Sequence, residues 1–262
     1  MRELTLDEIK QIGLEMFICF DKVCRENNIK YSIAYGTLIG AIRHKGFIPW
    51  DDDIDVIMCR DEYEKFLSVW KDGKFKLMTL QKGSAFWPML SRITDPRTYL
   101  VPPKICNHGV WLAVIPYDKV PDDPIEFKKH MDRITRYMQI LELKRAKIRI
   151  GGEGSVIKHL VKKVLQIALK PISPYTIGKH VEKLKTKYRN CNCKRVKPWD
   201  NHSKMLVDAS VFDEYIDVDF EGMKAMATAK YDYILRFEFG DYMQLPPEEE
   251  RVPKHGFKAY WK

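Results

Sequence analysis

The sequence predicts an α/β (α+β) fold, in which a mixed sheet core carries flanking helices and a basic helical insertion. Three observations predict it. Short apolar segments alternate with helical patterns up to residue 123, helical periodicity dominates over 124–169, and 45% of the 262 residues are hydrophobic, enough for a sizeable core. We expect a core over 1–123, a basic helical lobe over 124–200 and a C-terminal part over 201–262 that packs back on the core.

The first sixty residues predict a helix, a strand, a short helix and a second strand. Thr5 begins a capping box that ends at Glu8, and apolar residues follow at helical spacing. The short apolar and aromatic segment 31–35 ends at Gly36, which is a turn residue. The hydroxyl of Thr37 is then expected to cap the following helix. The expected bounds are 6–26 and 38–44 for the helices and 31–35 and 53–58 for the strands.

Beyond residue 60 the pattern predicts a helix over 61–70, strands over 75–80, 88–94 and 110–117, and helices over 124–150 and 154–169. The last helix has an apolar stripe opposite lysines. We interpret the stripe as packed core, and an interfacial helix on an anionic membrane is the alternative. The stripe consists of Ile157, Leu160, Val161, Val164, Leu165 and Ala168, and the lysines are Lys158, Lys162 and Lys163.

The charge is unevenly distributed along the chain. Residues 128–197 hold 20 Lys or Arg and four acidic residues, a net charge of +16, whereas the rest of the chain carries −7. A basic lobe suggests an anionic partner such as a phosphate-rich polymer or a lipid surface, and a solvated helical face is the ordinary alternative. Because no aromatic residues interleave with the basic ones as in base-stacking motifs, we expect no nucleic-acid partner.

The hydropathy disfavours a membrane-spanning protein, and the N-terminus disfavours a secreted one. No segment approaches about 18 uninterrupted apolar residues, and the first eight residues are too charged for a signal peptide. We therefore expect a cytoplasmic location, with peripheral association at the inner face of the membrane as a variant. The six cysteines are then expected to be reduced, without disulfides, and Cys191-Asn192-Cys193 lacks the second pair that a zinc site needs.

The most informative stretch runs from Gly36 to Val56. It places a Gly-Thr turn at a helix N-terminus next to a strand with two carboxylates on one face, Asp53 and Asp55. Free N–H groups at a helix N-terminus favour a phosphate, and paired carboxylates can hold Mg²⁺ or Mn²⁺. Four aspartates within five positions repel one another without a cation, although an acidic loop with a structural role is the alternative. Three basic residues between the turn and the acids can clamp a phosphate: Arg43, His44 and Lys45.

Aromatic residues flank the predicted strand ends, where ring faces can hold a cationic head group, although such rings more often belong to the core. They are Tyr35, Trp50, Trp87, Trp111 and Tyr117.

The stretch from Gly36 to Val56 resembles the LicD family, and the run from Phe239 to Glu248, continuing to Arg251 and His255, resembles the closing motif of that family. The resemblance covers about residues 4–94 and the last thirty or so. It implies a nucleotidyltransferase-like fold and a metal-dependent transfer of phosphocholine from CDP-choline to a hydroxyl of a cell-surface glycan, with CMP released. The acceptor would be a glycan or lipid-linked glycan: a teichoic acid, lipopolysaccharide or capsule precursor.

The resemblance also implies roles for individual residues. Asp53 and Asp55 would be catalytic and would hold Mg²⁺ or Mn²⁺, and Asp51 or Asp52 would support them or hold a second ion. The implied substrate-binding residues are Gly36, Thr37, Arg43, His44, Lys45, Trp50, Asp51, Arg251 and His255.

One position departs from the family pattern. Family members usually carry an Asp where this chain has Ala113, in the run from Gly109 to Pro116. That Asp would be a third metal carboxylate and a base for the acceptor hydroxyl, and Asp118 is a poor substitute because it lies on the opposite strand face. Either the chain is a natural member with altered or lost activity, or Ala has replaced Asp to hold a substrate complex. We expect donor binding with slow turnover.

Three other functions fit parts of the same pattern. The chain could move another alditol phosphate from a CDP donor, or act as a nucleotidyltransferase on RNA or a small molecule. A non-catalytic binder of anionic polymers or membrane surfaces, with a vestigial acidic cluster, is the third. Metal-dependent nucleotide binding separates the enzymes from the binder, and preference for CDP-choline over CTP separates the enzymes from each other.

Overall fold

The structure is a computed structural model that describes residues 2–80, 90–101, 109–146, 156–200, 204–253 and 255–262. These residues form the helices α1 (Leu6–Glu26), α2 (Tyr35–His44), α3 (Arg60–Val69), α4 (Pro124–Arg145), α5 (Val156–Ala168), α6 (Pro174–Lys185) and α7 (Tyr231–Phe239). Their strands are β1 (Ser32–Ile33), β2 (Ile54–Cys59), β3 (Lys76–Met78), β4 (Ser91–Thr94), β5 (Thr98–Val101), β6 (Trp111–Lys119), β7 (Arg195–Pro198), β8 (Val207–Asp208), β9 (Tyr215–Phe220), β10 (Met223–Thr228) and β11 (Lys258–Trp261). Short 3-10 helices lie at Thr186–Tyr188, Ala209–Phe212 and Glu248–Glu250.

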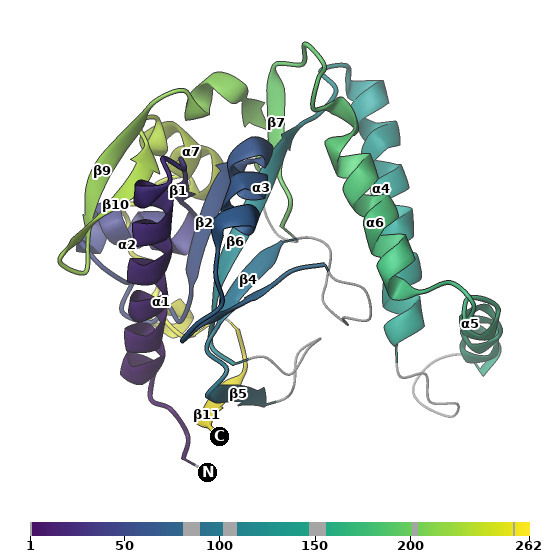
Figure 1. The fold of residues 1–262 in the computed structure, drawn as a ribbon, viewed down its shortest axis with the longest axis horizontal. Helices are drawn as coiled ribbons and strands as arrows, with labels where there is room; N and C mark the ends of the chain where they lie inside the picture. Colours follow the sequence, from purple (N-terminus) through teal and green to yellow (C-terminus); the bar gives the residue numbers. More distant parts are fainter. Residues whose placement is uncertain (1, 81–89, 102–108, 147–155, 201–203, 254) are drawn as a thin grey trace.

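The central sheet is mixed, and the predicted α/β class is confirmed. Its strand order is β1-β2-β6-β4-β3, with β7 added to β6 and β8 added to β7. Strands β2 and β6 are parallel, whereas β6 pairs antiparallel with β4 and β7. Strands β9 and β10 form one separate pair, and β5 and β11 form another. The β5–β11 pair brings the C-terminus close to the N-terminus (Figure 1).

Helix α1 begins and ends where the sequence predicts. The Thr5 hydroxyl accepts from the Glu8 N–H and the Glu8 carboxylate accepts from the Thr5 N–H, which completes the capping box. Met16, Phe17 and Phe20 on its apolar side are fully buried in the main core. Burial of each such side chain contributes roughly 1.5–3 kcal/mol, so α1 is a principal cover of the sheet.

Helix α2 begins three residues earlier than predicted. Ala34 is its N-cap, and Tyr35 opens the helix with a φ of 48°. The Thr37 hydroxyl does not cap the helix, because it accepts a hydrogen bond from the Asp55 N–H. Gly36 and Thr37 therefore form the first turn of α2 instead of preceding it.

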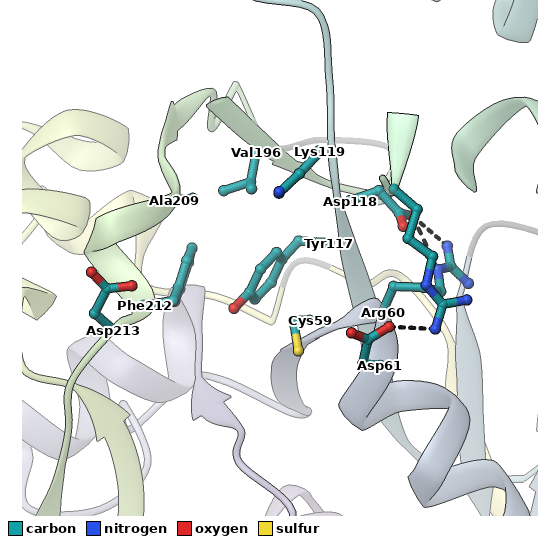
Figure 2. A pocket seen from close by; sticks show the side chains of 11 residues that line it. Cys59, Arg60, Asp61, Tyr117, Asp118, Lys119, Val196, Ala209, Phe212 and Asp213 are labelled. Atoms are coloured by element: carbon teal, nitrogen blue, oxygen red, sulfur yellow. Dashed lines mark hydrogen bonds and ion pairs between the residues drawn. The ribbon is translucent and has the colours of Figure 1, made fainter. Parts of the chain in front are cut away.

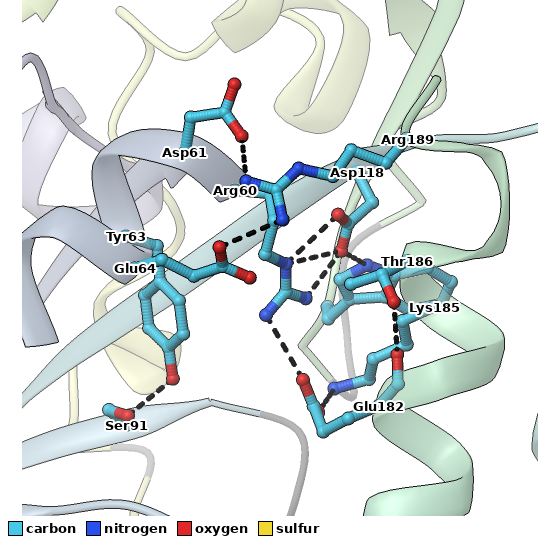
Figure 3. A network of polar contacts seen from close by, with 11 residues as sticks. Arg60, Asp61, Tyr63, Glu64, Ser91, Asp118, Glu182, Lys185, Thr186 and Arg189 are labelled. Carbon is cyan, nitrogen blue, oxygen red and sulfur yellow. Dashed lines mark hydrogen bonds and ion pairs between the residues drawn. The ribbon is translucent and has the colours of Figure 1, made fainter. Parts of the chain in front are cut away.

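Helices α4 and α6 form a lobe beside the sheet with its own small core around Val181 and Trp199 (Figure 1). A buried polar network joins this lobe to the sheet, as Figure 3 shows. Arg60 pairs with Asp118 at 2.5 Å and with Glu182 of α6 at 3.1 Å. Burial lowers the pKa of Arg60, but the hydrogen bonds and charge of Asp118 outweigh it, so the pKa is raised overall.

The apolar stripe of α5 is exposed, so its interpretation as packed core is wrong. Its aliphatic side chains keep about half or more of their surface in solvent, from 48% for Leu165 to 73% for Ile157. Periodicity reveals that a helix has an apolar face but does not tell which face the protein covers. Within the described residues, every helix is too short or too polar to cross a bilayer.

The expectation of reduced cysteines is wrong for one pair. Cys191 and Cys193 form a disulfide, because the turn between them brings their Cα atoms to 5.3 Å, within the range that a disulfide spans.

Candidate active site

Asp55 is held through its backbone at the junction of β1, α2 and β2. Its N–H donates to the Thr37 hydroxyl at 3.0 Å, and its carbonyl accepts from the Ala34 N–H at 3.0 Å. Asp53 and Asp55 lie on one side of the chain, and Ile54 is fully buried on the other, as strand alternation predicts. The backbone of Asp55 is thus fixed by the fold.

The Asp51 carboxylate reaches the first turn of α2. A Cβ added at Gly36 would lie 2.3 Å from Asp51 Oδ2, so the Asp51 carboxylate would have to move away to admit any larger residue. The N–H groups of a first helical turn have no intrahelical partner, and the positive end of the helix dipole stabilises a negative charge there. The fold therefore brings Gly36, Thr37 and Asp51 together at one anion-binding end of α2.

His255 comes from the far end of the chain and lies between two aspartates. Its Nδ1 is 2.6 Å from Asp52 Oδ1, and its Nε2 is 3.3 Å from Asp53 Oδ2. The Trp111 ring packs edge-to-face against the imidazole, with ring centroids 5.5 Å apart. One ligand atom from each of Asp52, Asp53 and His255 lies within 4.8 Å of the others. The structure thus adds Asp52 and His255 to Asp53, while Asp55 lies outside this group of three.

The aspartates of this region disfavour one another's ionised forms. Burial, followed by the charges of Asp53 and Asp52, raises the pKa of Asp51 to about 7. Burial also raises the pKa of Asp55 well above its usual value; the charges of Asp53, Asp51 and Asp200 add to the shift, and Arg92 opposes it. A bound cation relieves such repulsion. The carboxylate oxygens suit a hard divalent ion such as Mg²⁺ or Mn²⁺, whereas the imidazole nitrogen is a ligand that suits Zn²⁺ or Fe²⁺.

Ala113 stands between Asp55 and Arg92 in the sheet. The β2–β6 register pairs Asp55 with Ala113, and the β4–β6 register pairs Arg92 with Ala113. Side chains at directly paired positions contact each other, so an aspartate at 113 would adjoin both. Ala113 itself offers neither a metal ligand nor a proton acceptor. Asp118, on the opposite strand face, is buried against Arg60, which confirms that it is a poor substitute.

A further carboxylate reaches the site from the loop after β7. The Tyr35 hydroxyl donates to Asp200 Oδ2. The Trp199 N–H donates to the Pro116 carbonyl at 3.0 Å, which carries the β6–β7 pairing one residue beyond β7 and sets Asp200 beside β6. Asp200 was not predicted from the sequence, because a four-residue strand followed by Trp-Asp matches no motif.

The three basic residues expected at the phosphate lie at the other end of α2. Arg43 Nη1 donates to the Tyr242 carbonyl at 2.6 Å, and its Nε donates to His44 Nε2 at 2.9 Å. Because an α-helix rises 1.5 Å per residue, Arg43 is about 10 Å along the axis from Gly36. Lys45 is the exposed C-cap of α2. Burial, followed by the charges of Arg43 and Lys10, lowers the pKa of His44.

Trp50 and Arg251 meet next to the acidic loop, which consists of Asp51, Asp52 and Asp53 before β2. The Arg251 guanidinium lies 5.9 Å from the centroid of the Trp50 ring, so this ring face accepts a cation. Among the other flanking aromatics, Trp111 and Tyr117 are buried in the core, and Trp87 lies outside the described residues.

Comparison with known proteins places this site in a family. Residues 28–91 match the model described as LicD/FKTN/FKRP, nucleotidyltransferase domain, and they include α2, the acidic loop and β2. The chain is also 31% identical over 269 residues to the lipopolysaccharide cholinephosphotransferase LicD of Haemophilus influenzae, with 99% of each chain covered. This chain belongs to the LicD family. Shorter segments match uncharacterized proteins of Rickettsia typhi (47% over 55 residues, 20% of this chain and 18% of the relative) and Rickettsia prowazekii (63% over 38 residues, 14% of each).

A surface pocket of this LicD-type enzyme lies at the end of β2 (Figure 2). It is lined by Cys59 at the end of β2, by Tyr117 and Lys119 of β6, and by Phe212. Asp55 precedes Cys59 by four residues of strand, a distance of about 13 Å at 3.3 Å per residue. The pocket and the acidic loop are therefore at opposite ends of the parallel pair.

Proposed function

We propose that this LicD-family enzyme transfers phosphocholine from CDP-choline to a hydroxyl of a lipopolysaccharide-type glycan. The Haemophilus influenzae relative, which matches over 99% of both chains, carries the name of that activity. The observation that carries the proposal is the acidic loop facing the first turn of α2, where Asp51 lies against Gly36. The N-terminus of α2 can bind an anion, and the neighbouring carboxylates can bind a cation. Together they suit a diphosphate that carries a divalent metal ion.

The reaction fixes which phosphorus is attacked. The acceptor oxygen bonds to the phosphorus that carries choline, the bond from that phosphorus to the oxygen of CMP breaks, and the hydroxyl proton goes to a base. Transfer of the nucleotide would instead need attack on the cytidine-bearing phosphorus. The two reactions differ in how the donor is placed, so the groups that hold the donor decide the outcome.

Asp52, Asp53 and His255 would hold a divalent ion, and Asp55 is the neighbouring candidate ligand. Their fit rests on donor atoms within 4.8 Å of one another and on the repulsion that raises the pKa of Asp51 and Asp55. When bound, the ion would neutralise charge on the diphosphate and on the departing CMP.

The chain's own residues would orient the rest of the donor. The N–H groups of Gly36 and Thr37 would bind phosphate oxygens at the start of α2. The Trp50 ring, which already faces one cation in Arg251, would take the quaternary ammonium of choline.

We assign the proton of the acceptor hydroxyl to Asp200. Ala113 cannot accept a proton, and Asp200 is the further carboxylate whose charge acts on Asp55. The Tyr35 hydroxyl, held at the first residue of α2, orients the Asp200 carboxylate.

A transfer assay tests the proposal. The chain and its Ala113→Asp variant are incubated with CDP-choline, Mg²⁺ and lipopolysaccharide that lacks choline, and CMP and the modified glycan are measured by mass spectrometry. The proposal predicts equal amounts of CMP and glycan-bound phosphocholine. Release of pyrophosphate from CTP, with transfer of CMP to an acceptor, would instead indicate a nucleotidyltransferase. Glycan modification from CDP-ribitol but not from CDP-choline would assign another alditol phosphate.

A further inference from the structure

Helix α5 stands at the far end of the α4–α6 lobe, away from the central sheet (Figure 1). Its large apolar residues from Ile157 to Ile167 are exposed. Their exposed fractions are 73% for Ile157, 55% for Leu160, 51% for Val161, 58% for Val164, 48% for Leu165 and 54% for Ile167. A contiguous apolar surface of this kind marks an interaction site when it lies on a folded protein.

The helix is attached to the protein by its polar side. Gln166 Nε2 donates to the carbonyls of Leu143 at 3.1 Å and Ala146 at 2.9 Å, at the C-terminal end of α4. Lys144 Nζ donates to the carbonyl of Leu169 just beyond α5. At about 100° per residue, Gln166 is half a turn away from Ile157. The apolar side therefore faces away from the protein, the reverse of the arrangement in an ordinary surface helix.

The charges around the apolar side point to one kind of partner. Lys162 and Lys163 are exposed and flank Gln166 on the helix surface, where their alkyl chains can extend along the edges of the apolar side. Between Leu143 and Val181 the chain has nine Lys or Arg and one acidic residue. A second copy of the chain would bring two such basic segments together, whereas an anionic surface neutralises them.

We propose that α5 is an interfacial helix that binds the surface of an anionic lipid bilayer. The aliphatic side chains enter the boundary between head groups and acyl chains, and Lys162 and Lys163 contact anionic head groups. This inference concerns a different surface from the acidic loop and holds whatever donor the enzyme uses. It gives the basic lobe a place at the membrane, where lipid-linked acceptors are found.

Vesicle sedimentation of the full chain tests the proposal. The vesicles are phosphatidylcholine alone or phosphatidylcholine with about 30% phosphatidylglycerol, at low salt and at about 0.5 M salt. We expect binding to the anionic vesicles at low salt, reduced by about tenfold or more in a Leu160→Gln, Val164→Gln variant. A Lys162→Glu, Lys163→Glu variant is expected to lose the preference for anionic lipid.

The matched control is Ile125→Gln with Phe237→Gln, which removes apolar groups that are as exposed but lie on α4 and α7. It is expected to bind as the parent chain does. Because the α5 positions are exposed, thermal unfolding should be unchanged in every variant, which excludes misfolding as the cause of a loss.

Three results would overturn the proposal. The first is a parent chain that does not sediment with anionic vesicles. The second is vesicle binding that the lysine variant abolishes but the Leu160, Val164 variant leaves intact, since the attachment would then be electrostatic alone and the apolar side of α5 would not enter the bilayer. The third is a dimer, seen by analytical ultracentrifugation without lipid, that the Leu160, Val164 variant dissociates.

Discussion

Ala113 is paired with Asp55 in the register of the parallel strands β2 and β6, so residue 113 directly adjoins Asp55. Ala113→Asp is expected to raise the rate of CMP release about 100-fold, because the new carboxylate adds a ligand or a base beside Asp55. Ala113→Asn supplies the same shape without the charge and should leave the rate near that of the parent. Equal rates for the parent and Ala113→Asp would refute the role of this position.

Asp200 is expected to matter most while residue 113 is alanine. Asp200→Asn should lower the rate roughly 10–100-fold in the parent chain, because no other group then takes the hydroxyl proton. In the Ala113→Asp background the same change should cost no more than about threefold. Steady-state rates of the four chains measure the coupling. If Asp200→Asn had the same effect in both backgrounds, the two carboxylates would not share a task.

Tyr35→Phe separates positioning of Asp200 from its chemistry. The variant removes the hydroxyl that donates to Asp200 and leaves the carboxylate in place. We expect a smaller loss of rate than in Asp200→Asn, with the loss in kcat and little change in KM for the donor, since the carboxylate stays in place but is no longer oriented by the hydroxyl. A kcat equal to that of the parent chain would contradict this role for Tyr35.

The raised pKa of Asp51 makes the stability of the metal-free chain dependent on pH. A carboxyl whose pKa is raised by folding, here to about 7, stabilises the fold below its unfolded pKa near 4, and this contribution is lost as pH rises through about 7. Asp51→Asn should therefore gain more stability relative to the parent at about pH 8 than at about pH 5. Urea unfolding at both pH values measures the difference, and Mg²⁺ should reduce it. The exposed Asp7→Asn serves as the control; an equal gain at both pH values would rule out the assigned cause.

The buried pair of Arg60 and Asp118 should couple the α4–α6 lobe to the sheet. Asp118→Asn leaves a buried guanidinium without its full counter-charge, and we expect a loss of roughly 3–5 kcal/mol in the free energy of unfolding. Replacing both partners, by Arg60→Met with Asp118→Leu, should recover much of that loss. Asp61→Asn, which breaks an exposed pair with Arg189, should cost less than about 1 kcal/mol. If Asp118→Asn lowered the free energy of unfolding as little as Asp61→Asn does, the Arg60–Asp118 pair would not hold the α4–α6 lobe on the sheet.

Local patterns were sufficient where the determining contacts lie close in the sequence. The bounds of α1 follow from a capping box and apolar spacing within one segment, and the common side of Asp53 and Asp55 follows from strand alternation. The resemblance to the LicD family supplied His255, which the fold then carries to Asp52 and Asp53.

Long-range contacts set the parts that local patterns missed. Strand β5 has four residues and depends on β11 near the end of the chain. Asp200 reaches the site through a hydroxyl 165 positions away and through strand pairing, neither of which leaves a sequence signal. For α5, the spacing of apolar residues was identified, but its polar attachment to α4 through Gln166 decides which side is exposed.

The most direct test of the account is calorimetric titration of the chain with CDP-choline, with and without Mg²⁺, because binding can be measured without an acceptor and with Ala113 in place. The account predicts Mg²⁺-dependent binding that CTP and CDP-ribitol do not reproduce. Asp53→Asn should abolish this binding, and Asp219→Asn, at an exposed position on β9, should preserve it. Absence of binding in the presence of Mg²⁺, or equal binding of CTP, would contradict the assignment of a phosphocholine donor to this site.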